Sequence, residues 1–250
     1  MSGHSRWSKI KHTKGAVDIK RARIFTKLIR EVTVAARSGG ADPNGNPRLR
    51  HAMDTARAAN MPNDTITRAI KKGTGELEGV SYEELTYEGV GPAGTLFLIN
   101  VMTDNKNRTN PELRKMFERH NGQLGAAGSA GWAFEEKGLI SVAKEGASED
   151  HVFEVAAGAG AEDMEDLGDS WLVKTEKAAL DAVRAALAEA GVAVASAELG
   201  KVPKNKKVVS GRDAEVLMNL VDALEDHDDV QKVFYDFDVS EEALASLSRE

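Results

Sequence analysis

The chain has 250 residues, of which 41% are hydrophobic and 29% charged, and its formal net charge is −7. This composition is typical of a globular chain, and the length favours two or three modules over one compact core. Cysteine is absent, which excludes disulfide frameworks, thiolate zinc sites and cysteine nucleophiles. Because the sequence shows neither a signal peptide nor an apolar run long enough to span a bilayer, we expect a cytoplasmic protein without membrane contact.

Positive charge is concentrated near the amino terminus. Residues 1–75 contain sixteen Lys and Arg against five Asp and Glu, a balance of +11, whereas the remaining residues carry −18. A basic segment on an acidic body is typical of a protein that holds a polyanion at one end. The alternative is that solvent-exposed faces are unevenly charged.

Residues 1–17 are polar, basic and without periodicity, which predicts a mobile arm. Trp7 lies among cations, so its ring could stack on an unpaired base while neighbouring side chains hold phosphates, or it could pack back onto the first helix. The nucleic-acid-binding residues predicted in the arm are Arg6, Trp7, Lys9, Lys11 and Lys14.

Three helices are expected next, at about residues 18–38, 48–59 and 65–72. In the first, spacings of three and four predict an apolar stripe formed by Phe25, Leu28, Ile29, Val32 and Ala36. Most of its cations fall on the opposite side at 100° per residue. With the pair that ends the third helix, the predicted nucleic-acid-binding residues are Lys20, Arg23, Lys27, Arg30, Arg37, Lys71 and Lys72. Since no helix carries a convincing set for reading base edges, we expect affinity for phosphate more than sequence specificity.

From residue 81 the pattern changes to mixed strands and helices. Strands are expected at residues 82–90 and 95–102, and a helix is expected to open at Asn110-Pro111. A glycine series follows at every third position, formed by Gly122, Gly125, Gly128 and Gly131. Its amides could approach phosphate, or it could be a flexible connection into a strand at 132–134. The connection is favoured, because no lysine or helix start follows as in a P-loop.

Residues 138–199 predict the order strand, helix, strand, strand, helix, strand, which is the ferredoxin-like arrangement. A basic linker at 201–207 leaves this unit. A helix at 213–225 and a strand at 230–237 would then join residues 82–134 in a second α+β layer. The predicted fold class is therefore multidomain α+β, with a basic helical domain at 1–79, a discontinuous α+β domain at 80–136 and 205–240, an inserted ferredoxin-like domain at 137–204, and a tail at 241–250.

No catalytic or metal-binding motif is recognisable. The six histidines form no HExxH pattern, and the acidic runs at 162–166 and 225–229 lack the spacing and glycine of a calcium loop. Solvated faces explain these runs better than metal ligands do. We therefore predict no enzyme activity, no metal and no cofactor, and a metal-dependent enzyme is the least favoured alternative.

Four stretches of the chain resemble the YebC/PmpR family, which includes the mitochondrial translational activator of cytochrome oxidase subunit I. They are residues 3–12 (GHSRWSKIKH), 60–70 (NMPNDTITRAI), 103–109 (TDNKNRT) and 128–134 (GSAGWAF). The resemblance implies a helical amino-terminal domain and two α+β domains, one inserted in the other. It also implies a nucleic-acid-binding role in gene expression. The favoured reading is a ribosome-associated translation factor that binds rRNA and assists elongation through proline-rich runs, and the alternative is a DNA-binding transcriptional regulator. The resemblance supplies no catalytic residues, and the oligomeric state stays open.

Overall fold

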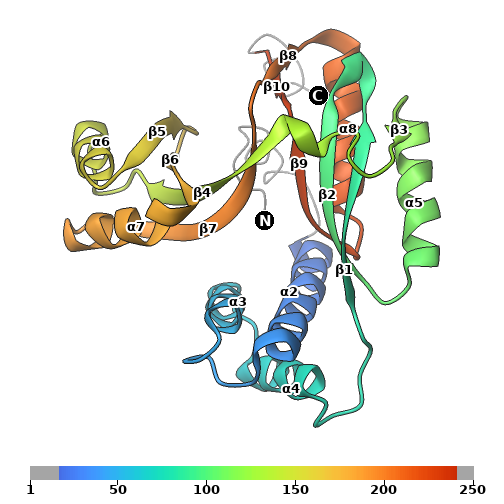
Figure 1. Cartoon of the computed structure of the whole chain (residues 1–250), viewed down its shortest axis with the longest axis horizontal. Coiled ribbons are helices and arrows are strands. Elements are labelled where there is room, and N and C mark those ends of the chain that lie inside the picture. Colours follow the sequence, from blue (N-terminus) through green and yellow to red (C-terminus); the bar gives the residue numbers. More distant parts are fainter. Residues whose placement is uncertain (1–16, 241–250) are drawn as a thin grey trace. The chain divides into compact units, whose positions relative to one another are not determined.

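The computed structural model describes residues 17–240, with side chains from residue 21 onward, and divides into two units (Figure 1). The first comprises residues 17–130 and Val209–Val233, and the second comprises Gly131–Val208 and residues 234–240. The predicted α+β class is confirmed, with helices first along the chain and sheets after them. The domain boundary predicted at residue 80, within the first unit, stays a prediction. No helix of the described part is both long and apolar enough to cross a membrane.

The first unit begins with three helices, α2 (Val17–Gly39), α3 (Pro47–Ala58) and α4 (Asn63–Thr74). The apolar stripe of α2 packs against the other two helices in a core that includes Val32, Leu49 and Ile66. Helix α3 begins after Asn46, whose side chain accepts a hydrogen bond from the backbone N–H of Leu49. Proline at the first helical position suits this start, because no backbone N–H is needed there.

Helices α2 and α4 approach so closely that the contact requires a glycine. A Cβ atom on Gly73 would lie 2.3 Å from the carbonyl oxygen of Thr33. Across the same contact, the Thr33 hydroxyl donates to the carbonyl oxygen of Ala69 at 3.3 Å. Helix α4 ends at Gly75, which adopts the left-handed conformation with φ 84°. The close contact holds one side of α4 against α2 and leaves the other side to solvent.

The rest of the first unit is a four-stranded sheet in the order β3-β1-β2-β9. Its elements are β1 (Glu83–Val90), β2 (Leu96–Thr103), β3 (Gln123–Leu124) and β9 (Val230–Tyr235), with helices α5 (Lys106–Arg119) and α8 (Gly211–Glu225). Strands β1 and β2 are antiparallel, and β2 is almost entirely buried. The ring of Phe97 on β2 meets that of Phe117 on α5 edge to face, with centroids 5.5 Å apart. This sheet positions the start of α5 beside the end of β2.

Helix α5 begins earlier than the sequence predicted. The side chain of Asn105 accepts a hydrogen bond from the backbone N–H of Arg108 at 3.2 Å, so the helix starts at Lys106. Pro111 lies inside the helix, where its ring removes one backbone donor. The earlier start places Arg108 and Thr109 in the first turns of the helix.

The second unit is built on a sheet in the order β5-β6-β4-β7, in which all neighbouring strands are antiparallel. Its elements are β4 (Phe134–Ala143), α6 (Glu149–Gly158), β5 (Ala161–Asp166), β6 (Ser170–Thr175), α7 (Leu180–Glu189) and β7 (Val194–Pro203). This is the predicted ferredoxin-like order. Helices α6 and α7 cover one face of the sheet (Figure 1), over a core that includes Ile140, Val173 and Leu187.

The ends of this sheet differ from the prediction. The expected strand at 132–134 is a single 3₁₀ turn, η3 (Gly131–Ala133), followed by β4. The expected linker at 201–207 is partly strand, because β7 stays paired with β4 as far as Pro203 opposite Phe134. A short ribbon follows, formed by β8 (Lys207–Val209) and β10 (Phe237–Val239). Helix α7 follows a 3₁₀ turn at Lys177–Ala179.

Candidate nucleic-acid interface

Twelve residues were predicted to bind nucleic acid, and the structure describes the side chains of six. The arm, with Arg6, Trp7, Lys9, Lys11 and Lys14, lies outside the described residues. Lys20 belongs to α2, but its side chain is also outside the described part. Of the other six, Arg23, Lys27 and Arg30 face the acidic segment 225–229, whereas Arg37, Lys71 and Lys72 are exposed.

The cationic side of α2 packs against the segment that follows α8, which corrects the expectation of a free solvent face. Arg23 forms an ion pair with Asp226, with 2.9 Å between Nη1 and Oδ1. Lys27 donates from Nζ to the carbonyl oxygen of Glu225 at 2.6 Å. Burial lowers the pKa of Lys27, against the opposing effect of the neighbouring carboxylates. Helical periodicity gives the direction of these side chains but not the segment that packs on them.

Asp229 is the centre of this contact, a carboxylate residue that is only 1% exposed. Arg30 places Nη1 2.7 Å from Oδ1 of Asp229, and Arg108 places Nη2 3.0 Å from Oδ2. The hydroxyl groups of Thr103 and Thr109 lie 3.0 and 2.6 Å from the same Oδ2. Asp229 therefore links α2 to β2 and α5 within the first unit, and the reading of run 225–229 as a solvated face is wrong at this residue.

The surroundings of Asp229 favour its ionised form. Burial by itself raises the pKa of this carboxyl. The hydrogen bonds from Thr109 and Arg108 and the charge of Arg30 lower the pKa by more than burial raises it, so the result is about 2. Three of the four donor side chains come from residues 103–109, one of the stretches that carry the family resemblance. The sequence did not reveal this role, because the acceptor lies 120 residues beyond Thr109.

Four exposed cations of the helical region lie on α3 and α4. Arg68, Lys71 and Lys72 are three and four residues apart and share the exposed side of α4. Arg50 is exposed on α3. Within residues 21–240, none of these four has a carboxylate partner. Arg37 is exposed at the end of α2 and donates to a serine hydroxyl. Arg50 and Arg68 were not among the predicted site residues, although their charge and helical spacing could have indicated them.

A cavity of about 640 Å³ opens beside the contact between α2 and the segment after α8. Its charged lining consists of Arg23, Arg30, Arg108, Lys115 and Arg119 with Glu112, Asp226, Asp228 and Asp229. The carboxylates offset most of the positive charge, and two of the guanidinium groups are already bound to Asp229. The cavity is therefore a weaker phosphate site than the exposed side of α4.

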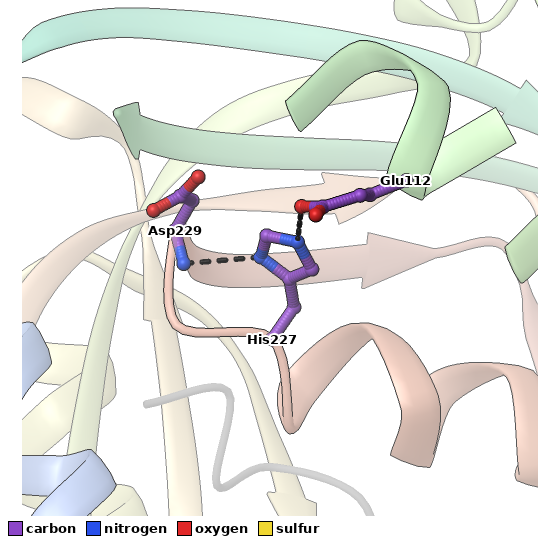
Figure 2. Close-up of side chains that lie close together, drawn as sticks. All are labelled: Glu112, His227 and Asp229. Atoms are coloured by element: carbon purple, nitrogen blue, oxygen red, sulfur yellow. Dashed lines mark hydrogen bonds and ion pairs between the residues drawn. The ribbon is translucent and has the colours of Figure 1, made fainter. Parts of the chain in front are cut away.

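Three potential metal ligands meet at this cavity. Ligand atoms of Glu112, His227 and Asp229 lie within 4.8 Å of one another. Figure 2 shows how they are joined: Nε2 of His227 lies 2.9 Å from Oε2 of Glu112, and Nδ1 accepts from the backbone N–H of Asp229 at 3.1 Å. This pattern assigns the imidazole proton to Nε2, from which it donates to Glu112. Because two guanidinium groups contact the Asp229 carboxylate, its surroundings disfavour a metal cation, and the cluster is a hydrogen-bonded chain.

The amides of the glycine series are partly occupied by a carboxylate. The Glu88 side chain accepts from the backbone N–H groups of Gly128, at 2.8 Å, and of Ala130. The Gly125 N–H donates to the carbonyl oxygen of Glu88 at 2.8 Å. A phosphate would have to displace the Glu88 side chain. These contacts therefore favour the interpretation of the glycine series as a connection between elements over that of an anion site.

Comparison with known proteins covers nearly the whole chain. Residues 5–76 match the TACO1/YebC protein N-terminal domain, and residues 82–237 match the TACO1/YebC second and third domain. A protein of Geobacter sulfurreducens named probable transcriptional regulatory protein is 53% identical over 247 residues, which are 99% of this chain and 100% of that protein. A protein of the same name from Desulfosudis oleivorans is 52% identical over 241 residues, 96% and 98% of the two chains.

The fold is also found in a solved structure. A crystal structure described as a conserved hypothetical protein of Aquifex aeolicus is 42% identical and has a TM-score of 0.87, covering 96% of this chain and 99% of that one. The two domain matches include the stretches 60–70, 103–109 and 128–134 and most of the stretch 3–12. The chain belongs to the TACO1/YebC family.

Proposed function

We propose that this protein is a nucleic-acid-binding regulator of gene expression that holds phosphate groups through α3 and α4. The observation that carries the proposal is the set of exposed cations on these helices. Arg68, Lys71 and Lys72 share one side of α4, and no carboxylate of the described residues neutralises them. Cationic side chains that bind the phosphates of a nucleic acid backbone release its condensed counterions, and cations without a carboxylate partner are available for this binding.

The same surface favours phosphate contacts over sequence reading. Lysine ammonium groups act as point charges on flexible stems and bind phosphate without registering the base. The contacts of α2 with the acidic segment fix the helical core, so the α4 cations are presented from a supported helix. The function we infer is therefore the binding of nucleic acid with little sequence dependence.

The finer proposal is a translation factor that docks on ribosomal RNA and assists elongation through proline-rich sequences. Such a factor needs no catalytic side chain, since positioning the reactants supplies much of the rate enhancement. A DNA-binding transcriptional regulator is the second candidate, and the names of the Geobacter and Desulfosudis relatives favour it. The two candidates share the electrostatics and differ in the nucleic acid that they bind.

The first experiment tests the phosphate surface. Lys71→Gln with Lys72→Gln removes two cations from α4, and Lys177→Gln with Arg184→Gln removes two exposed cations from the second unit as a matched control. The slope of log affinity against log salt should become less negative by about 1.4 to 1.8 in the α4 variant, since each phosphate contact contributes about 0.7 to 0.9. An unchanged slope, or the same change in the control, would overturn the proposal.

The second experiment separates the two candidates. The full chain is sedimented with ribosomes, and its affinities for random and promoter DNA are measured at one salt concentration. Ribosome association with similar affinities for both DNAs supports the translation factor. A preference of about a thousandfold for promoter DNA, without ribosome association, would establish the transcriptional regulator instead.

A further inference from the structure

Helix α6 of the second unit carries an aromatic side chain on its solvent side. Val152 and Ala156 of this helix are buried in the core, four residues apart as the helical period requires. Phe153 lies about 100° around the helix from Val152 and is 56% exposed. A helix that covers a core normally has polar residues at such a position, because an exposed ring leaves apolar area in water. Most of the ring of Phe153 is therefore not used by the core.

Acidic side chains surround this ring. Glu149 and Asp150 precede Phe153 by four and three residues, which places them on the same side of the helix, and Glu154 follows it directly. All three are exposed, and α6 contains neither lysine nor arginine. Among the residues that the structure describes, no cation forms an ion pair with these three carboxylates. With Ala157, which is exposed four residues after the ring, these residues form what we call the α6 surface.

The helix beneath the α6 surface is held in place. The hydroxyl of Ser148 caps it by accepting from the backbone N–H of His151 at 3.4 Å. On the opposite side, Val152 packs in the core with Trp171. A ring on such a helix loses little beyond its own rotational freedom when a ligand covers it. Acids in a first turn stabilise a helix through its dipole, but that effect needs no aromatic ring beside them.

The chemistry of the α6 surface selects the kind of partner. Carboxylates without cations repel the phosphates of a nucleic acid and the anionic headgroups of a membrane. They attract lysine and arginine, so their potential is complementary to that of a basic protein segment. The ring adds apolar area that an aliphatic side chain can cover, and its face also attracts a guanidinium or ammonium group.

We propose that the α6 surface binds a basic segment of a protein partner. An apolar side chain of that segment covers Phe153, and flanking lysines or arginines pair with Glu149, Asp150 and Glu154. This inference goes beyond the nucleic-acid-binding function and does not depend on it. The protein then has contacts of opposite charge in its two units, α4 for phosphate and α6 for a basic protein.

The probe is a fluorescein-labelled peptide of fourteen residues, made of leucine and lysine at helical spacing, and its binding to the full-length chain is measured by fluorescence anisotropy. Phe153→Ala should weaken binding by about 4- to 20-fold, the loss expected when the exposed half of a phenylalanine is no longer buried. Phe153→Leu should lose less. Glu149→Gln with Asp150→Asn and Glu154→Gln should weaken binding and reduce its salt dependence. A peptide with glutamate in place of lysine should not bind.

Two matched controls use exposed residues of the first unit. Leu77→Ala removes an apolar side chain that is 41% exposed. Glu118→Gln with Asp213→Asn and Glu215→Gln removes three exposed carboxylates. Both controls should bind the lysine peptide as the parent does. Because the ring of Phe153 is mostly exposed, Phe153→Ala should also keep the circular dichroism spectrum of the parent.

An unchanged affinity in Phe153→Ala, or an equal loss in the controls, would overturn the proposal. Other occupants give different results, each of which would also overturn it. If Phe153→Ala dissociates a dimer in sedimentation velocity, the α6 surface joins two copies of the chain, and if it weakens binding of RNA, the occupant is a nucleic acid. If Arg6→Gln with Lys9→Gln and Lys11→Gln raises the affinity for the peptide, the chain's own amino terminus is the occupant. Failure of the α4 variants to change nucleic-acid binding leaves this inference untouched.

Discussion

Replacing Asp229 by asparagine removes the charge at the centre of the contact between α2, β2 and α5. The amide is similar in size, but it offers one acceptor oxygen and turns an NH₂ group toward donors. Arg30 and Arg108 then face no carboxylate at this position, although both approach it within 3.0 Å in the native chain. Breaking a buried ion pair by removing one partner is strongly destabilising, so we expect the free energy of unfolding to fall by about 3 kcal/mol at pH 7.

The pH dependence gives a second magnitude. The folded chain holds the pKa of Asp229 at about 2, against 3.8 for an ordinary aspartate. A pKa lowered on folding stabilises the native state above pH 3.8, and this stabilisation disappears as the pH falls through about 2. At 1.36 kcal/mol per pKa unit the contribution is about 2 kcal/mol, of which about half is lost by pH 3. The difference in stability between the native chain and Asp229→Asn should therefore narrow from pH 5 to pH 2.

The assay is urea unfolding followed by circular dichroism, with deuterium exchange to locate the change. Exchange should accelerate in α2 and α5. In a Trp7→Phe background the remaining tryptophans, Trp132 and Trp171, both lie in the second unit, so the midpoint of their emission should not change. Asp228→Asn is the matched control, because it removes the same charge from an exposed neighbour and should lower stability by less than about 0.5 kcal/mol. Equal effects of the two substitutions, or a stability difference that does not change with pH, would refute the role assigned to Asp229.

Two further substitutions test the same unit. Thr109→Val removes the 2.6 Å hydrogen bond to Asp229, so the pKa of that carboxyl should rise and the free energy of unfolding should fall by about 1 to 2 kcal/mol. Carbon-13 NMR titration measures this pKa, and an unchanged value would contradict the hydrogen bond. Gly73→Ala places a Cβ 2.3 Å from the Thr33 carbonyl oxygen, so the free energy of unfolding should fall by about 1 to 3 kcal/mol. The measurement is thermal unfolding, whose midpoint should move to a lower temperature. Gly45→Ala is its control and should be nearly neutral, because a Cβ there would lie 3.9 Å from the carbonyl oxygen of Asp42. Equal effects of the two substitutions would show that the close contact is not the cause.

The sequence predicted those parts of the fold whose signals are local. The stripe through Phe25 and Val32 has the helical period, and it packs in the core of α2, α3 and α4. The order of strands and helices from 138 to 199 is regular enough to give the ferredoxin-like arrangement before any contact is known. Both depend on side chains close together in the chain, which is where periodicity carries information.

The parts that the sequence did not reveal depend on distant partners. Asp229 belongs to a run of acids that resembles an ordinary solvated surface, and only the fold brings Thr103 and Arg108 to it. The start of α5 was placed at Pro111, because proline is common in a first turn, but the side chain of Asn105 caps the helix earlier. Such contacts have no periodic signature, so a single sequence does not determine them.

The cations of the helical region differ in how readily they can bind phosphate, because some of them are paired with the acidic segment 225–229. For Arg30 to bind a phosphate, it would have to leave a buried carboxylate, at a cost of about 3 kcal/mol. The pair of Arg23 with Asp226 is exposed on both sides and contributes at most about 1 kcal/mol, so Arg23 can exchange its partner. Lys71 and Lys72 have no carboxylate to leave among the described residues. The balance of +11 therefore overstates the charge available to a polyanion, and α4 rather than α2 should dominate the salt dependence of binding.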